Sequence, residues 1–232
     1  MALSQSLALV SRWAARLAIM VLPITLSGCL ITARGVYFTS DDFVQPKALT
    51  GVWQSVPQEG TDKTAEVTYV QIKPVENGLL RATPLLKDGR VDINNDTADF
   101  GICDLGSGNY VVATTEPEGD GTKSEFLGLK VEEDKLTFVM FDGGSTDAQQ
   151  AAFTQLLTQN GLSRDPSEKN DVRLAGVVTK ENVKALFTGL MADPSQYGGN
   201  VTVYTKAVGI VVKQPPKGAA KPRHRRHHHH HS

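Results

Sequence analysis

Short runs of alternating apolar and polar residues dominate the sequence between residues 48 and 142. In the run "AEVTYVQIKPV" at 65–75, for example, Val70 and Ile72 alternate with Tyr69 and Gln71. A period of two is typical of a β-strand with one buried face. The runs are separated by turn-forming Gly, Asn and Asp residues, and this spacing predicts an antiparallel meander that forms a barrel or a sandwich. The expected strands are 50–56, 65–75, 78–86, 98–105, 109–116, 124–133 and 135–142.

Helical periodicity replaces this pattern after residue 144. The stretch 145–161 predicts a helix capped by Asp147 and stopped by Asn160-Gly161. The stretch 179–194 predicts a second helix, because its apolar residues recur at i, i+3, i+4, i+7 and i+8. A last strand is expected over 200–212. The fold class is therefore mainly β (α+β), with two amphipathic helices in the C-terminal half. The stripe of the second helix is Val183, Leu186, Phe187, Leu190 and Met191.

The first 28 residues have the composition of a secretory signal. They contain Arg12 and Arg16, no acidic residue, and an apolar run from Leu17 to Leu26 that ends in small residues. This run is about half of the ~20 residues that a membrane-spanning helix requires. A cleaved signal is therefore favoured over a permanent membrane helix.

The four residues Leu26-Ser27-Gly28-Cys29 resemble the lipobox of bacterial lipoproteins. The resemblance implies that residues 1–28 are removed and that Cys29 is acylated, with palmitate or similar chains. Several chains on one residue hold a protein firmly at a membrane, whereas one chain alone is marginal. Leu30, which stands where an Asp would favour the inner membrane, implies a Gram-negative outer membrane and a body facing the periplasm. An ordinary signal with a chance cysteine is the alternative.

Charge divides the remaining chain into two parts. Of 24 Lys and Arg residues, two lie in the first 28 residues and six in the last 20, which leaves sixteen in the body against all 25 Asp and Glu. We expect an anchor and linker at 29–47, a single β-rich domain at 48–212, and a basic, disordered tail at 213–232. An acidic body argues against nucleic acid as a partner, because phosphate contacts require clustered Lys and Arg.

Histidine is confined to the tail, and this limits the chemistry that the body can perform. Without histidine the body cannot contain a Ser-His-Asp triad, a Cys-His pair or an H-E-x-x-H zinc site. We therefore predict no catalytic residue and no cofactor in the body, although hydrolysis by two carboxylates requires no histidine. The histidines are His224, His227, His228, His229, His230 and His231.

The tail allows three interpretations. Its imidazoles could bind Zn or Ni without a preformed pocket. Its positive charge could contact anionic lipid headgroups or an anionic envelope polymer. It could also be a purification tag, although a retained signal and a terminal Ser232 favour a natural reading frame.

Two further residues carry expectations. With Cys29 acylated, Cys103 has no partner for an intramolecular disulfide, and its apolar surroundings predict a buried structural thiol. Asp92, Asn94 and Asp96 follow the opening spacing of a calcium loop. The loop's required glycine and its bidentate acid are both missing, so a turn built on Asx side chains is the favoured interpretation.

Gly51-Val52-Trp53 resembles the G-x-W motif of the first strand in lipocalin-like barrels. The resemblance implies a Trp that closes one end of the barrel beneath a ligand cavity. A core Trp on a first strand is the simpler alternative.

Taken together, these features predict a lipid-anchored bacterial cell-envelope lipoprotein with a non-catalytic binding or structural role. A lipocalin-like carrier of a small apolar ligand is the first alternative, and an envelope protein that binds metal through its His-rich tail is the second.

Overall fold

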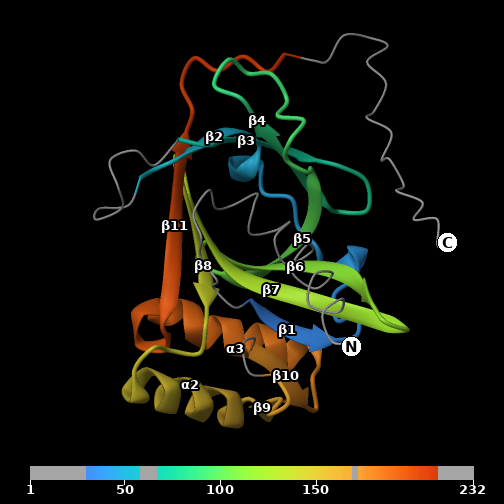
Figure 1. The fold of residues 1–232 in the computed structure, drawn as a ribbon, viewed down its shortest axis with the longest axis vertical. Coiled ribbons are helices and arrows are strands. Elements are labelled where there is room, and N and C mark those ends of the chain that lie inside the picture. Colours follow the sequence, from blue (N-terminus) through green and yellow to red (C-terminus); the bar gives the residue numbers. More distant parts are fainter. Residues whose placement is uncertain (1–29, 58–66, 169–171, 214–232) are drawn as a thin grey trace, which may run out of the picture.

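The computed structural model describes residues 30–57, 67–168 and 172–213 (Figure 1). Within these ranges the chain is mainly β, with two α-helices in its C-terminal half. This confirms the fold class expected from the sequence.

Eight antiparallel strands form a closed barrel, in which neighbours along the chain are also neighbours in space. The barrel is closed by pairing of its first strand, β2, with its last, β11, where Trp53 lies opposite Lys206. The predicted meander is therefore a barrel and not a sandwich. The barrel strands are β2 (Gly51–Ser55), β3 (Tyr69–Pro74), β4 (Leu80–Leu85), β5 (Ala98–Gly106), β6 (Asn109–Glu118), β7 (Gly121–Glu132), β8 (Lys135–Phe141) and β11 (Gly199–Lys206).

Three short strands extend the sheet beyond the barrel, namely β1 (Ile31–Arg34), β10 (Val172–Gly176) and β9 (Leu162–Arg164). The sheet forks at β7, because β1 pairs with its segment 123–126 and β8 pairs with its segment 128–132. Strand β1 then pairs in parallel with β10. The segment 29–47, for which the sequence predicted an anchor and linker, thus contains a central strand of this extension.

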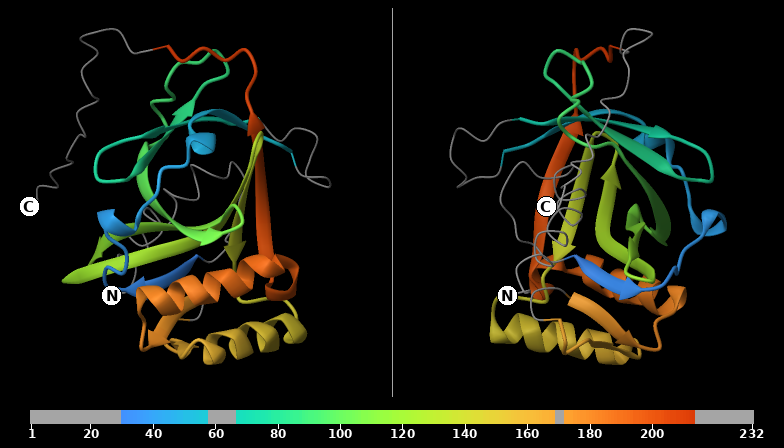
Figure 2. Two further views of the ribbon diagram at one scale, coloured as in Figure 1. Left: turned by 180° about the vertical axis from the view of Figure 1, so that it is seen from behind. Right: turned by 45° about the vertical axis from the view of Figure 1, so that its right-hand side comes forward.

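Two helices cover the outer side of the sheet, α2 (Asp147–Gln159) and α3 (Lys180–Ala192). Both views in Figure 2 place them at the same end of the molecule as β9 and β10. The N-cap of α2 is Thr146, whose side chain accepts a hydrogen bond from the Gln149 backbone. The sequence placed the cap at Asp147, which is instead the first helical residue. Asn160 ends this helix as expected, and every residue of the apolar stripe predicted for α3 is buried.

Successive side chains of a strand point to opposite faces of the sheet, so the barrel strands contribute to two separate apolar clusters. Trp53, Leu129, Phe138 and Tyr204 belong to a cluster on the barrel's interior face. The alternate residues, such as Val111 and Phe141, pack with α2 and α3 in the second cluster. A glycine allows this close helix packing, since a Cβ atom at Gly128 would lie 2.2 Å from the Met191 sulfur.

Candidate binding site

The hairpin β6–β7 changes its chemistry along one face. Inside the barrel this face carries Val112 and Leu127, which belong to the interior cluster. Two residues further along each strand, toward the hairpin tip, the same face carries Thr114 and Glu125, which are also buried. An interior face that is apolar at one end therefore becomes polar where the sheet leaves the barrel.

Four buried polar residues lie in register across neighbouring strands. Thr114 on β6 is opposite Glu125 on β7, Glu125 is opposite Thr32 on β1, and Thr32 is opposite Arg173 on β10. Their exposed fractions are 8%, 3%, 4% and 8%. Since neighbouring strands lie about 4.8 Å apart, this polar row extends roughly 14 Å. We use the term polar row for these four residues.

Each member of the polar row has a polar atom without a hydrogen-bond partner among the described residues. The atoms are Thr114 Oγ1, Glu125 Oε2, Thr32 Oγ1 and Arg173 Nε. Buried polar atoms in folded proteins are nearly always paired, because an unpaired one retains its desolvation cost. Four such atoms in one line are therefore an unusual concentration, and they mark this face as a candidate binding site.

The charges of the polar row are compensated locally. Lys123 Nζ lies 2.6 Å from Glu125 Oε1. The Arg173 guanidinium lies 2.8 Å from a Glu118 carboxylate oxygen and 3.0 Å from one of Glu168. Burial alone would lower the pKa of the Lys123 ammonium. The hydrogen bond and charge of Glu125, with smaller contributions from Glu116 and Glu118, outweigh burial and raise that pKa. Lys123 is therefore held as a cation.

A polar pocket of about 700 Å³ opens beside the row. This volume is within the range of small-ligand sites, about 300–1,000 Å³. Arg173 belongs to both the pocket wall and the row, so the pocket adjoins the row at that end. Thr114, at the other end of the row, lines a second pocket of about 380 Å³. The larger pocket is lined by Arg34, Gly35, Glu118, Gly119, Asp120, Gly121, Thr122, Lys123, Glu168 and Arg173.

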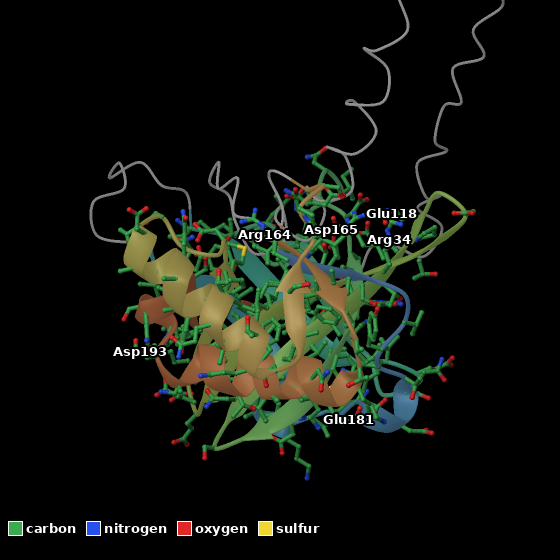
Figure 3. The ribbon with its side chains drawn as sticks, turned by 90° about the horizontal axis from the view of Figure 1, so that it is seen from below. Arg34, Glu118, Arg164, Asp165, Glu181 and Asp193 are labelled. Carbon is green, nitrogen blue, oxygen red and sulfur yellow. The ribbon has the colours of Figure 1, made fainter. Side chains whose placement is uncertain are left out.

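Further charged residues lie at the same edge of the molecule. Figure 3 shows Arg34, Glu118, Arg164 and Asp165 on this edge, far from Glu181 and Asp193 at the two ends of α3. The Asp165 backbone donates a hydrogen bond to the Arg173 carbonyl. Hydrogen bonds from Ser167, and then the charges of Arg173 and Arg34, lower the pKa of the Asp165 carboxyl. The charges of Arg173 and Arg34 therefore act on the loop that follows β9.

Trp53 is fully buried at the other end of the barrel. Its indole nitrogen donates to the Leu49 carbonyl at 2.9 Å, and Lys206 Nζ lies 3.9 Å above its ring. The same ammonium donates to the carbonyls of Ala48 and Thr50, which flank Leu49 at the end of a 3-10 turn. Trp53, Lys206 and this turn therefore pack together where β2 pairs with β11, and the closing role that the G-x-W resemblance implies stays a prediction.

The structure also places the other residues that the sequence singled out. Cys103 is fully buried against the helices and is a free thiol, as expected. The carboxylate oxygens of Asp92 accept hydrogen bonds from Asn94 and Asn95, which is the Asx turn that the sequence favoured. Nothing brings Asp92 or Cys103 to the polar row.

The predicted lipidation and metal sites lie outside the described residues. Cys29 precedes the first described residue, Leu30, and the histidines of the tail follow the last, Lys213. Among residues 30–57, 67–168 and 172–213, no three His, Cys, Asp or Glu side chains form a group that could hold a metal ion. Within the same ranges, no helix combines the length and apolar character needed to cross a membrane.

Sequence reasoning did not find the polar row. Thr32, for example, lies in a segment where no strand was expected. One signal was present, because the strand 109–116 changes from "VVA" to "TTE" along its length. Comparisons with protein-family models, curated proteins and solved structures found no match to this chain.

Proposed function

We propose that this protein is a lipid-anchored lipoprotein of the Gram-negative cell envelope, attached through Cys29, whose body binds a ligand without catalysis. The lipobox supports the anchor. The polar row supports the binding role and is the observation on which that role rests, because it combines four buried, unpaired polar atoms with an adjoining pocket. The proposed location is the outer membrane, with the body in the periplasm.

The ion pairs of the site support binding over hydrolysis. A hydrolase with two carboxylates uses one as an acid and leaves the other free to act as a base or a nucleophile. Here Glu118 and Glu168 share the Arg173 guanidinium, and Glu125 binds Lys123. Carboxylates held in this way are suited to orienting their cationic partners.

Replacing Cys29 tests the anchor. In Cys29→Ala cells, we expect the protein to move from the membrane fraction to the soluble fraction and to lose incorporation of labelled palmitate. The chain offers a matched control, because Cys103→Ala removes the other cysteine and leaves the lipobox intact. Cys103→Ala should remain acylated and membrane-bound. A Cys29→Ala protein that is processed normally and stays in the membrane would refute the anchor.

A lipocalin-like carrier is the second candidate. The closed eight-stranded meander and the buried Trp53 at one end favour it, since barrels of this size can hold one small ligand. The interior cluster of large side chains favours instead a barrel filled by its own residues. Mass spectrometry of an organic extract of the natively isolated protein separates the two, because a carrier releases a stoichiometric apolar molecule.

Metal binding by the tail remains a separate proposal that rests on sequence alone. Deleting the residues after Pro222 should abolish Zn or Ni binding if the tail carries it. The same segment, through its positive charge, would also strengthen contact with anionic headgroups or envelope polymer.

A further inference from the structure

We propose that the polar row binds a neutral polyhydroxylated ligand, that is, a saccharide. The inference rests on the binding role proposed above and gives that role a ligand class. It follows from two properties of the row: its charges are already compensated, and its remaining demand is for hydrogen bonds.

Charge compensation argues against an ionic ligand. Glu125 is neutralised by Lys123 at 2.6 Å, and Arg173 by Glu118 and Glu168 at 2.8 and 3.0 Å. An anion at Arg173 would displace or repel two carboxylates that already occupy its guanidinium. A cation at Glu125 would similarly meet the Lys123 ammonium. Neutral ligands meet neither penalty, because they leave both sets of ion pairs intact.

The unpaired atoms define what such a ligand must supply. Glu125 Oε2 can only accept a hydrogen bond while ionised, and Arg173 Nε can only donate one. The hydroxyls of Thr32 and Thr114 can do both. A ligand that satisfies the row must therefore present donors and acceptors side by side along roughly 14 Å, at intervals near the ~4.8 Å strand spacing. Sugar hydroxyls have this property, since each of them donates and accepts.

The pocket provides an entrance to the row. Lys123 and Arg173 line it, and from Arg173 the row continues through Thr32 and Glu125 to Thr114. Its volume of about 700 Å³ suits a short oligosaccharide. Gly119 and Gly121 at the exposed β6–β7 turn and the half-buried Gly35 line the opening without bulky side chains. A chain of sugars could thus rest one end in the pocket and place its following units along the row.

Threonine-to-valine substitutions test the proposal without disturbing the fold. Thr32→Val and Thr114→Val each keep the shape of the side chain and remove one unpaired hydroxyl. We expect each to raise the urea midpoint of the free protein, because a buried unpaired hydroxyl is costly. We expect each also to weaken saccharide binding about tenfold, because the ligand loses a hydrogen-bond partner. Improved stability together with reduced affinity is a signature that a purely structural role does not produce.

A matched control lies elsewhere in the barrel. Thr202 on β11 is equally buried, at 8% exposure, and its Oγ1 is also without a partner among the described residues. It lies outside the polar row, because β8 separates β11 from β7. Thr202→Val should therefore stabilise the protein in the same manner and leave saccharide affinity unchanged.

The binding measurement uses the full, processed protein in a polyoxyethylene detergent, whose headgroup carries no sugar. Isothermal titration with a β-1,4-linked N-acetylglucosamine trimer and with maltotriose covers two neutral saccharides. Glycine betaine and inorganic phosphate provide zwitterionic and anionic probes. The proposal predicts binding of at least one saccharide, weakened in both row variants and unchanged in Thr202→Val.

Three results would overturn it: no saccharide binding, equal affinity in all three variants, or preferred binding of betaine or phosphate. None of them affects the anchor, which the Cys29 and Cys103 variants test independently. Betaine or phosphate binding would keep the binding role and reject only the ligand class. Failure of all four probes, with a stoichiometric apolar molecule in the extract, would replace the binding role by that of a carrier.

Discussion

The two halves of the hairpin β6–β7 share one sheet face, but the buried side chains on that face are apolar in one half and polar in the other. The half inside the barrel carries Val112, Leu127 and Leu129, which pack into the interior cluster. The half beyond the fork carries Thr114 and Glu125, which are equally buried but have atoms without a partner among the described residues. Burial is therefore the same in both halves, and only the satisfaction of the buried groups differs.

This difference distinguishes the apolar interior of the barrel from the proposed binding site. Apolar side chains gain free energy when they leave water, so the barrel half needs no ligand to be stable. Unpaired polar side chains lose free energy in the same position, so the outer half is stabilised by whatever supplies the missing hydrogen bonds. The row therefore lowers the stability of the free protein at the place where we propose that it binds its ligand.

The largest effect on stability is expected at Trp53, where β2 pairs with β11. Trp53→Ala removes a fully buried indole together with its hydrogen bond to Leu49 and its contact with Lys206. Such truncations cost about 3–5 kcal/mol of unfolding free energy. Arg34→Ala, at the exposed end of β1, should change the unfolding free energy by less than about 0.5 kcal/mol, because this side chain is exposed. Urea denaturation measures both, and similar losses would show that the two regions are not as different as proposed.

An intermediate effect is expected on the helix side of the sheet. Burial raises the pKa of the Cys103 thiol from 9.0 to about 12. Because the folded value is the higher one, the thiol's contribution to stability is complete below pH 9 and is lost as the pH rises toward 12. At pH 10 this amounts to about 1.4 kcal/mol.

The measurement is the loss of unfolding free energy between pH 8 and pH 10. Wild-type protein should lose about 1.4 kcal/mol more than Cys103→Ala, since other groups titrate alike in both. An identical pH dependence would mean that Cys103 is accessible in the folded protein, and that the helices do not seal this face.

Much of the fold could be predicted from periodicity and turn residues, and the elements that were missed have identifiable causes. Strand β3 buries every second residue and helix α3 buries one stripe, so their periods are visible in the sequence. Strands β5 to β8 are buried on both faces but are long apolar runs between clear turn signals, so they could be predicted without alternation. Strand β1 is buried on both sides from Ile31 to Ala33, and β10 from Val172 to Leu174. With both faces covered, alternation disappears and a short strand resembles a linker. Asp147 was mistaken for a cap because Thr146 and Asp147 are both suitable residue types, and only the backbone distinguishes them.

The candidate site could not be predicted for a different reason. Thr32, Thr114, Glu125 and Arg173 are distant in sequence, and only strand register brings them into one row. That register depends on a fork in the sheet, where β7 leaves β8 and pairs with β1. A composition such as "TTE" can indicate that a strand becomes polar. It contains no information about which strand will lie beside it.

The most direct test of the account compares two substitutions two residues apart on one face of β6. Thr114→Val should raise the free energy of unfolding by about 1 kcal/mol, because it removes an unpaired buried hydroxyl. Val112→Thr should lower it by about 1–3 kcal/mol, because it introduces one into the apolar wall. Equilibrium urea denaturation of both variants and of wild type gives the sign of each change in unfolding free energy. Opposite signs are the predicted result, and a loss of stability in Thr114→Val would show that its hydroxyl is satisfied and that the polar row is ordinary core.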